Sequence, residues 1–155
     1  MTRLSRARVV AAEPDRVWSL VSDPHSLPRW WPRVKRVEDV RGEGEDARWT
    51  AVLATDRGAG VRADFRCTAH AGGRAYAWAQ EIAGTPFERI LKCAELEIEI
   101  TGESVGTRVV LTSDETLRGL SRLGSPMMRG AARRRLDEAL EGIDRALVGE
   151  DPADG

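Results

Sequence analysis

Alternation of apolar and polar residues dominates the middle of this 155-residue chain. In the segment VRADFRCTAH at 61–70, small or apolar residues at odd positions alternate with polar ones at even positions, which places His70 on the polar face. A period of two is typical of a β-strand with one buried face. The same period, interrupted by glycine-containing turns, predicts hairpin-linked strands over residues 34–41, 47–55, 61–70, 74–83, 87–100 and 106–115.

A further alternating segment, LSRARVVAA at 4–12, precedes these strands. Ala7 and Ala11 fall on one side of it, and Arg6 and Arg8 fall on the other. We expect the alanine side to face the core. With this strand, the pattern predicts a seven-stranded antiparallel sheet with one buried face.

Two short helices are predicted between the first strand and the second. Pro14 suits the first position of a helix, where no backbone N–H is needed, and Asp-Pro at 23–24 repeats the start signal. Trp30 and Trp31 fall in the second of these helices, and Pro32 ends it. Because a residue before proline disfavours helical geometry, the two neighbouring rings need not face the same way.

A long helix is predicted from Ser125-Pro126 onward, because its apolar residues form one stripe at helical spacing. The stripe consists of Met128, Ala132, Leu136, Ala139, Leu140, Ile143 and Leu147. The apolar face of the sheet is available to cover this stripe. The element order therefore predicts one α+β domain over residues 1–149, followed by a disordered polar tail at 150–155.

Composition and charge exclude several classes of function. The 24 lysine and arginine residues balance 25 aspartate and glutamate residues, so no positive field favours nucleic acid. No apolar run reaches the roughly 20 residues of an integral membrane segment, and no signal core opens the chain, so we expect a cytoplasmic protein. Cys67 and Cys93 lack redox or metal-ligand spacing, and His25 and His70 lack neighbouring ligands. We therefore expect reduced thiols, no metal and no cofactor.

Four segments of the chain resemble a known superfamily. They are the opening strand with AAEPDRVWSLVSDPHSLPRWWPRV, the mid-chain YAWAQEIAGTPFERIL, GTRVVL before the last helix, and the terminal RRRLDEALEGIDRAL. Together they resemble the START-like, or Bet v 1-like, helix-grip superfamily (SRPBCC), and within it the bacterial polyketide cyclase/dehydrase and lipid-transport group. The resemblance implies a helix-grip fold: a curved seven-stranded antiparallel sheet wrapped round a long C-terminal helix, with two short helices after strand one. It also implies an internal cavity for a hydrophobic small molecule.

The composition of the inward positions is compatible with such a cavity. Many of them carry alanine, which either brings sheet and helix closer or leaves space between them. These alanines are Ala7, Ala11, Ala51, Ala63, Ala69, Ala132 and Ala139. The resemblance favours the cavity, and we predict ligand contacts from Trp31, Trp49, Phe65, Tyr76, Trp78, Gln80, Met128 and Arg135. Trp30 is expected in the core and Trp31 at the mouth of the cavity.

Two strands have an uncertain register. In the strand at 74–83 we place Tyr76, Trp78, Gln80 and Ile82 inward, because this set carries the large apolar bodies. Gln80 then needs a partner, which is a ligand carbonyl or hydroxyl, a protein group or water; with the opposite register it is exposed.

In the strand at 87–100 the apolar side chains change parity between Leu91 and Leu96. A β-bulge near Ala94 would reconcile the two halves. Such a bulge either re-aims side chains near a pocket or is a bend without functional consequence.

Arg135 falls inside the apolar stripe of the long helix, whereas Arg134 points away and Arg133 lies at the border. An inward arginine binds a ligand carboxylate or polarises a carbonyl, or it pairs with a glutamate or reaches water at the cavity end. Met128 either adapts to varied ligands or is ordinary core. The segment LRGLSRLGSP at 117–126 is either a mobile lid or a plain connection.

The residues show no nucleophile–base motif, so no catalytic residue is assigned. We expect the chain to carry or sequester a hydrophobic small molecule such as a lipid, polyketide or aromatic compound. One alternative is a polyketide cyclase/dehydratase, in which Arg135, Tyr76 or Gln80 assists enolisation. Another is a co-chaperone-like protein-interaction domain that uses the outer sheet face. The expected state is a monomer or a homodimer.

Overall fold

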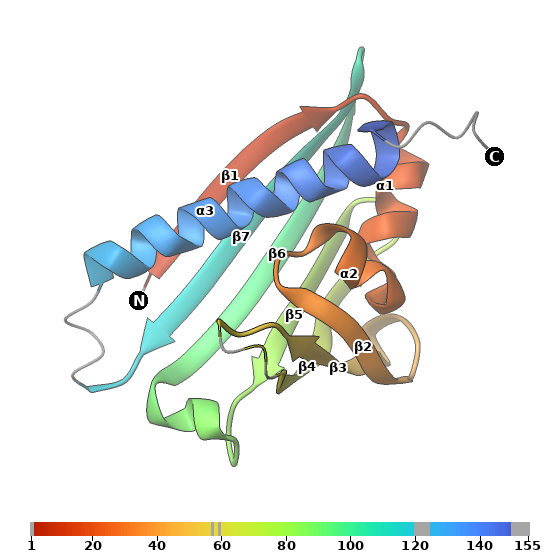
Figure 1. Cartoon of the computed structure of the whole chain (residues 1–155). Coiled ribbons are helices and arrows are strands. Elements are labelled where there is room, and N and C mark those ends of the chain that lie inside the picture. Colours follow the sequence, from red (N-terminus) through yellow and green to blue (C-terminus); the bar gives the residue numbers. More distant parts are fainter. Residues whose placement is uncertain (1, 57, 59, 120–124, 150–155) are drawn as a thin grey trace.

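The computed structural model describes residues 2–56, 58, 60–119 and 125–149. Its sheet has seven antiparallel strands in the order β1-β7-β6-β5-β4-β3-β2 (Figure 1). The strands are Thr2–Val10 (β1), Val34–Arg41 (β2), Arg48–Leu53 (β3), Val61–Ala71 (β4), Ala75–Glu81 (β5), Leu91–Glu103 (β6) and Gly106–Leu117 (β7). Successive strands from β2 to β7 pair as hairpins, and β1 pairs with β7, so the predicted sheet is confirmed.

The helix α3 (Ser125–Asp144) lies across the inner face of the curved sheet and continues into a π-helical turn, η5 (Arg145–Gly149) (Figure 1). The two short helices, α1 (Pro14–Val21) and α2 (Leu27–Trp30), lie near the end of α3. The single-turn helices are η1 (Pro24–Ser26), η2 (Gly44–Asp46) and η3 (Pro86–Arg89). This arrangement is the predicted helix-grip fold. No helix in the described ranges is long and apolar enough to span a membrane.

The apolar stripe of α3 packs on the inner face of the sheet. Leu136, Ala139 and Ile143 are completely inaccessible to solvent, as are Ile98 on β6 and Leu111 on β7. Burial of a Leu or Ile side chain contributes about 1.5–3 kcal/mol, so this contact is the main support of the grip. The sheet and α3 are therefore closely packed along this stripe, and any open space must lie beside the stripe or before it.

The inward face of β1 is the opposite of the predicted one. Val10 is inaccessible, whereas Ala7 and Ala11 are exposed. Arg6 and Arg8 instead point to α3. Their Nε and Nη2 donors bind Asp137 and Asp144, respectively, at 2.8 Å. β1 is the edge strand of the sheet and runs beside α3. Ion pairs rather than apolar side chains therefore occupy most of its inner face.

A β-bulge in β4 reverses the direction of its last side chains. The pairing with β5 shifts between Cys67 and Ala69. His70 therefore lies on the inner face, with its ring centroid 5.1 Å from that of Trp18 and 5.9 Å from that of Tyr76. The placement of His70 on the polar outer face was wrong, because an inserted residue breaks the alternation on which it depends.

The register of β5 and β6 agrees with the sequence prediction in its main features. Tyr76, Trp78 and Ile82 are buried. β6 begins at Leu91, and its pairing with β7 shifts between Leu91 and Cys93. The predicted change of parity is thus present, slightly before the expected position. The residues just before β6 form η3 rather than strand.

Candidate ligand-binding pocket

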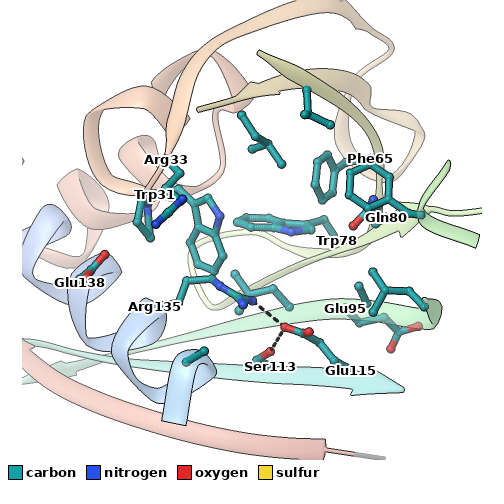
Figure 2. A pocket seen from close by; sticks show the side chains of 18 of the residues that line it. Trp31, Arg33, Phe65, Trp78, Gln80, Glu95, Ser113, Glu115, Arg135 and Glu138 are labelled. Carbon is teal, nitrogen blue, oxygen red and sulfur yellow. Dashed lines mark hydrogen bonds and ion pairs between the residues drawn. The ribbon is translucent and has the colours of Figure 1, made fainter. Parts of the chain in front are cut away.

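A pocket of about 590 Å³ lies between the sheet and the middle of α3 (Figure 2). Its walls come from α3, from β5, β6 and β7, from the facing ends of β3 and β4, and from the residues after α2. Arg33 and Arg134 belong to its lining and are exposed, so the pocket reaches solvent at this rim. Arg134 was expected to point away from the stripe, and it lines the rim because the helix is open to the pocket on this flank.

Aromatic rings form the apolar wall of the pocket. Trp31, Phe65, Trp78 and Phe87 all line it. Trp78 contacts two of the other rings of this wall. Its ring centroid lies 5.4 Å from that of Trp31 and 6.5 Å from that of Phe65, both in edge-to-face geometry. Such faces provide large apolar contact areas for a ring or an acyl chain.

The local sequence explains why Trp31 reaches the pocket and Trp30 does not. Trp31 has extended geometry, φ −85° and ψ 128°, as expected for a residue before Pro32. The two rings therefore diverge, with an interplanar angle of 81°. Trp30 is 2% exposed and belongs to the core, whereas Trp31 lines the pocket (Figure 2).

One ion pair lies inside the pocket. Arg135 on α3 donates from Nη1 to Oε1 of Glu115 on β7 at 2.6 Å. The hydroxyl of Ser113 donates weakly to the same oxygen at 3.5 Å (Figure 2). The Glu115 side chain is 11% exposed and that of Arg135 is 37% exposed, so the pair is anchored at its buried carboxylate end. Of the interpretations of Arg135, pairing with a glutamate is the one that the structure shows.

Gln80 is the second polar group in the wall. It lies on the inner face of β5 and lines the pocket, as predicted. Its Nε2 is buried and has no hydrogen-bond partner among the described residues. A buried amide without a partner is costly, and a half-turn of the amide exchanges its donor and acceptor ends. Gln80 is therefore suited to bind a polar atom of a ligand.

The remaining predicted contacts lie outside the pocket lining. Trp49 and Tyr76 are each 2% exposed and pack behind Trp78, at centroid distances of 6.0 and 6.3 Å. Met128 is half-buried in the first turns of α3 and does not line the pocket. Alternation identifies inward positions but not which of them other side chains cover. Ligand binding by Trp31, Phe65, Trp78, Gln80 and Arg135 stays a prediction.

Sequence reasoning missed Glu115. The inward positions of β7 include Val109 and Leu111, and Glu115 continues the same parity. A carboxylate at the same parity as these buried apolar residues was therefore the feature of the sequence that could have identified Glu115. The lid predicted for 117–126 falls largely on residues 120–124, which lie outside the described residues, as does the predicted tail. Among the described residues, no group of three or more potential ligands could hold a metal ion.

Tyr76 gives a spectroscopic test of this packing. Burial raises the pKa of its hydroxyl, which has no hydrogen-bond partner among the described residues. It is the only tyrosine of the chain, so tyrosinate absorbance reports on it alone. We expect this absorbance to appear only well above pH ~10, the ordinary midpoint.

Stability should follow the same titration. A pKa raised in the folded state contributes stability below the unfolded value, and this contribution is lost as the pH rises toward the folded pKa. Tyr76→Phe should be neutral or stabilising by up to about 1 kcal/mol and should flatten the alkaline decline. A midpoint near the ordinary value would contradict the buried placement.

Comparisons with known proteins agree with this architecture. A model of the family described as polyketide cyclase / dehydrase and lipid transport matches residues 1–148. No curated protein matches the sequence. The structure is similar to that of a Thermus thermophilus protein with TM-score 0.76 and 20% identity, covering 96% of this chain and 98% of the other.

Two further solved structures are similar. A START superfamily protein from Mycobacterium smegmatis has TM-score 0.75 and 16% identity, covering 94% of this chain and 96% of the other. The di-domain ARO/CYC protein BexL, from the BE-7585A biosynthetic pathway, has TM-score 0.77 and 11% identity. That match covers 97% of this chain and 51% of BexL. At these identities the likeness concerns the fold.

Proposed function

The chain belongs to the polyketide cyclase / dehydrase and lipid-transport family, and from this membership and its pocket we propose that it carries or sequesters a hydrophobic small molecule. The observation that supports the proposal is the aromatic-walled pocket of about 590 Å³, a volume within the usual range of small-molecule sites. Lipids, polyketides and aromatic compounds are the ligand classes proposed. A cytoplasmic location and a monomeric or homodimeric state remain predictions.

The polar groups of the pocket fit a carrier. Gln80 would bind one polar atom of the ligand, and Trp31 and Trp78 would contact its apolar body. Trp31 lies near the exposed rim, so it would be among the first residues to meet an entering ligand. A few placed polar groups in an apolar wall orient a ligand without requiring chemistry on it.

Native mass spectrometry tests the proposal. Protein purified from its own host is expected to retain a small molecule, and Ala94→Leu is expected to abolish that retention, because Ala94 lines the pocket and the larger side chain fills its floor. Ala7→Leu, on the exposed outer face of β1, is the matched control and should retain the ligand. Equal retention by both variants would place the ligand outside this pocket.

A second candidate is a cyclase or dehydratase acting on a poly-β-ketone chain. The contact of Arg135 with Glu115 inside the pocket favours it, since an enzyme needs convergent polar groups at one point. A turnover assay separates the two functions: an enzyme releases a cyclised or dehydrated product, whereas a carrier returns its ligand unchanged.

No observation favours the co-chaperone-like alternative. Among the described residues, the exposed large apolar side chains belong to separate elements of the fold. They are Val9, Val61, Ile90, Val105, Met127 and Val148. An interaction module would need such residues in one contiguous patch.

A further inference from the structure

We infer that Glu115 makes this pocket select ligands whose polar end is a neutral carbonyl and reject the corresponding carboxylates. The inference rests on the proposed function, because it concerns the ligand of the same pocket. It reverses the simplest expectation for an inward arginine, which is to bind an acid.

The hydrogen bonds of Arg135 leave donors for a ligand. Among the described residues its guanidinium makes one hydrogen bond, from Nη1 to Glu115. A guanidinium has five N–H donors in a fixed plane, so the others have no protein partner there. Arg135 lines the pocket beside Trp31 (Figure 2). A ligand oxygen in the pocket can therefore accept from this side chain without displacing Glu115.

The charge of Glu115 determines which kind of ligand oxygen can bind Arg135. Its carboxylate is buried to 11% exposure and already neutralises Arg135 at 2.6 Å. A ligand carboxylate on the same guanidinium would approach Glu115 closely, and like charges repel strongly where solvent screening is weak. A ketone, lactone or quinone oxygen accepts the same hydrogen bonds without that repulsion. Rejection of the wrong partner by a placed charge is an ordinary route to specificity.

The other charged groups of the lining do not supply this discrimination. Arg33, Arg134, Glu95 and Glu138 all line the pocket and are all exposed. Solvent screens their interactions with a ligand. Among the described residues of the lining, Glu115 carries the only negative charge that is buried beside the guanidinium, so solvent screens its repulsion of a bound carboxylate least.

The sheet register places a small side chain beside the ion pair. Ala94 on β6 pairs directly with Glu115 on β7, and its methyl group forms the floor there. Gln80 projects from β5, the next strand, so it lies two strand spacings, about 10 Å, from the strand of Glu115. A ring over Ala94 would have Arg135 at one edge and Gln80 toward the other. The ligand class is thus a ring compound with a neutral carbonyl.

A matched pair of probes tests the inference. Acetylnaphthalene and naphthoate, substituted at the same ring carbon, are nearly isosteric and differ in charge. Calorimetric titration of the full chain near neutral pH should show tighter binding of the ketone. In Glu115→Gln, naphthoate affinity should rise by about tenfold or more, equivalent to about 1.4 kcal/mol, while ketone affinity changes little. Glu138→Gln removes an exposed carboxylate of the same pocket and should leave the ratio unchanged.

The outcomes separate the inference from the proposed function. If the ketone binds and Glu115→Gln leaves the ratio as in the wild type, the inference is overturned and the pocket remains a binding site. If neither the ketone nor unsubstituted naphthalene binds, the proposed function fails with it.

Arg135→Met provides the second variant, needed if Glu115→Gln does not fold. It should weaken ketone binding several-fold and leave naphthalene binding unchanged, because only the ketone uses the guanidinium. Equal effects on the two probes overturn the inference.

Discussion

Gly142→Ala is expected to destabilise the protein by about 3 kcal/mol, although it adds a single methyl group to a helix. A Cβ at this position would lie 2.3 Å from the carbonyl oxygen of Trp30 and 2.8 Å from its Cα. Both atoms are backbone, so α2 cannot yield by a side-chain rotation and must move away from α3. The buried Trp30 ring would move with it, and so would Trp31 at the pocket.

Gly130 provides the control for this substitution. It lies in the same helix, and a Cβ there would meet nothing within 4 Å. Alanine is favoured over glycine inside a helix by about 1 kcal/mol, so Gly130→Ala should stabilise the protein. Urea denaturation measures both changes in the free energy of unfolding. A Gly142→Ala protein as stable as the wild type would show that α2 and α3 are not in this close contact.

Periodicity predicts the fold where side chains alternate without interruption. The apolar parity of β5 placed Tyr76 and Trp78 inward, and the proline after Trp31 predicted that the two neighbouring tryptophans diverge. The same reasoning failed at His70, because one inserted residue in β4 reverses every later side chain. A bulge depends on how two strands pair, and the pattern of one strand gives no information about that pairing.

The predicted site is incomplete for a different reason. Arg135 could be placed inward from its position on the helix, but its partner depends on where α3 crosses β7. Glu115 lies 20 residues earlier in the chain, and only the packed helix brings the two together. Met128 belongs to the same apolar stripe as Leu136 yet lies outside the pocket lining. The helical spacing of apolar residues predicts which face of α3 is buried, but not which residues of that face border the pocket.

Trp78→Ala is expected to lower the free energy of unfolding by about 3–5 kcal/mol, the range for truncating a buried large aromatic residue. Trp78 is 5% exposed, and its ring has five aromatic neighbours. Their centroids lie at 5.4 Å (Trp31), 6.0 Å (Trp30), 6.0 Å (Trp49), 6.3 Å (Tyr76) and 6.5 Å (Phe65). These neighbours come from α2, β3, β4, β5 and the residue after α2, so one ring joins the pocket wall to the short helices.

Trp18→Ala is the matched comparison, because it removes the same side chain from a less buried place. Trp18 is half-buried and contacts only His70 and Tyr76 among the aromatic rings of the described residues. Its truncation should cost clearly less than that of Trp78 in the same denaturation experiment. Trp78→Ala should also weaken naphthalene binding, whereas Trp18→Ala should not, since Trp18 does not line the pocket. Equal losses of stability would mean that the wall does not depend on Trp78, and unchanged naphthalene binding would remove that ring from the ligand site.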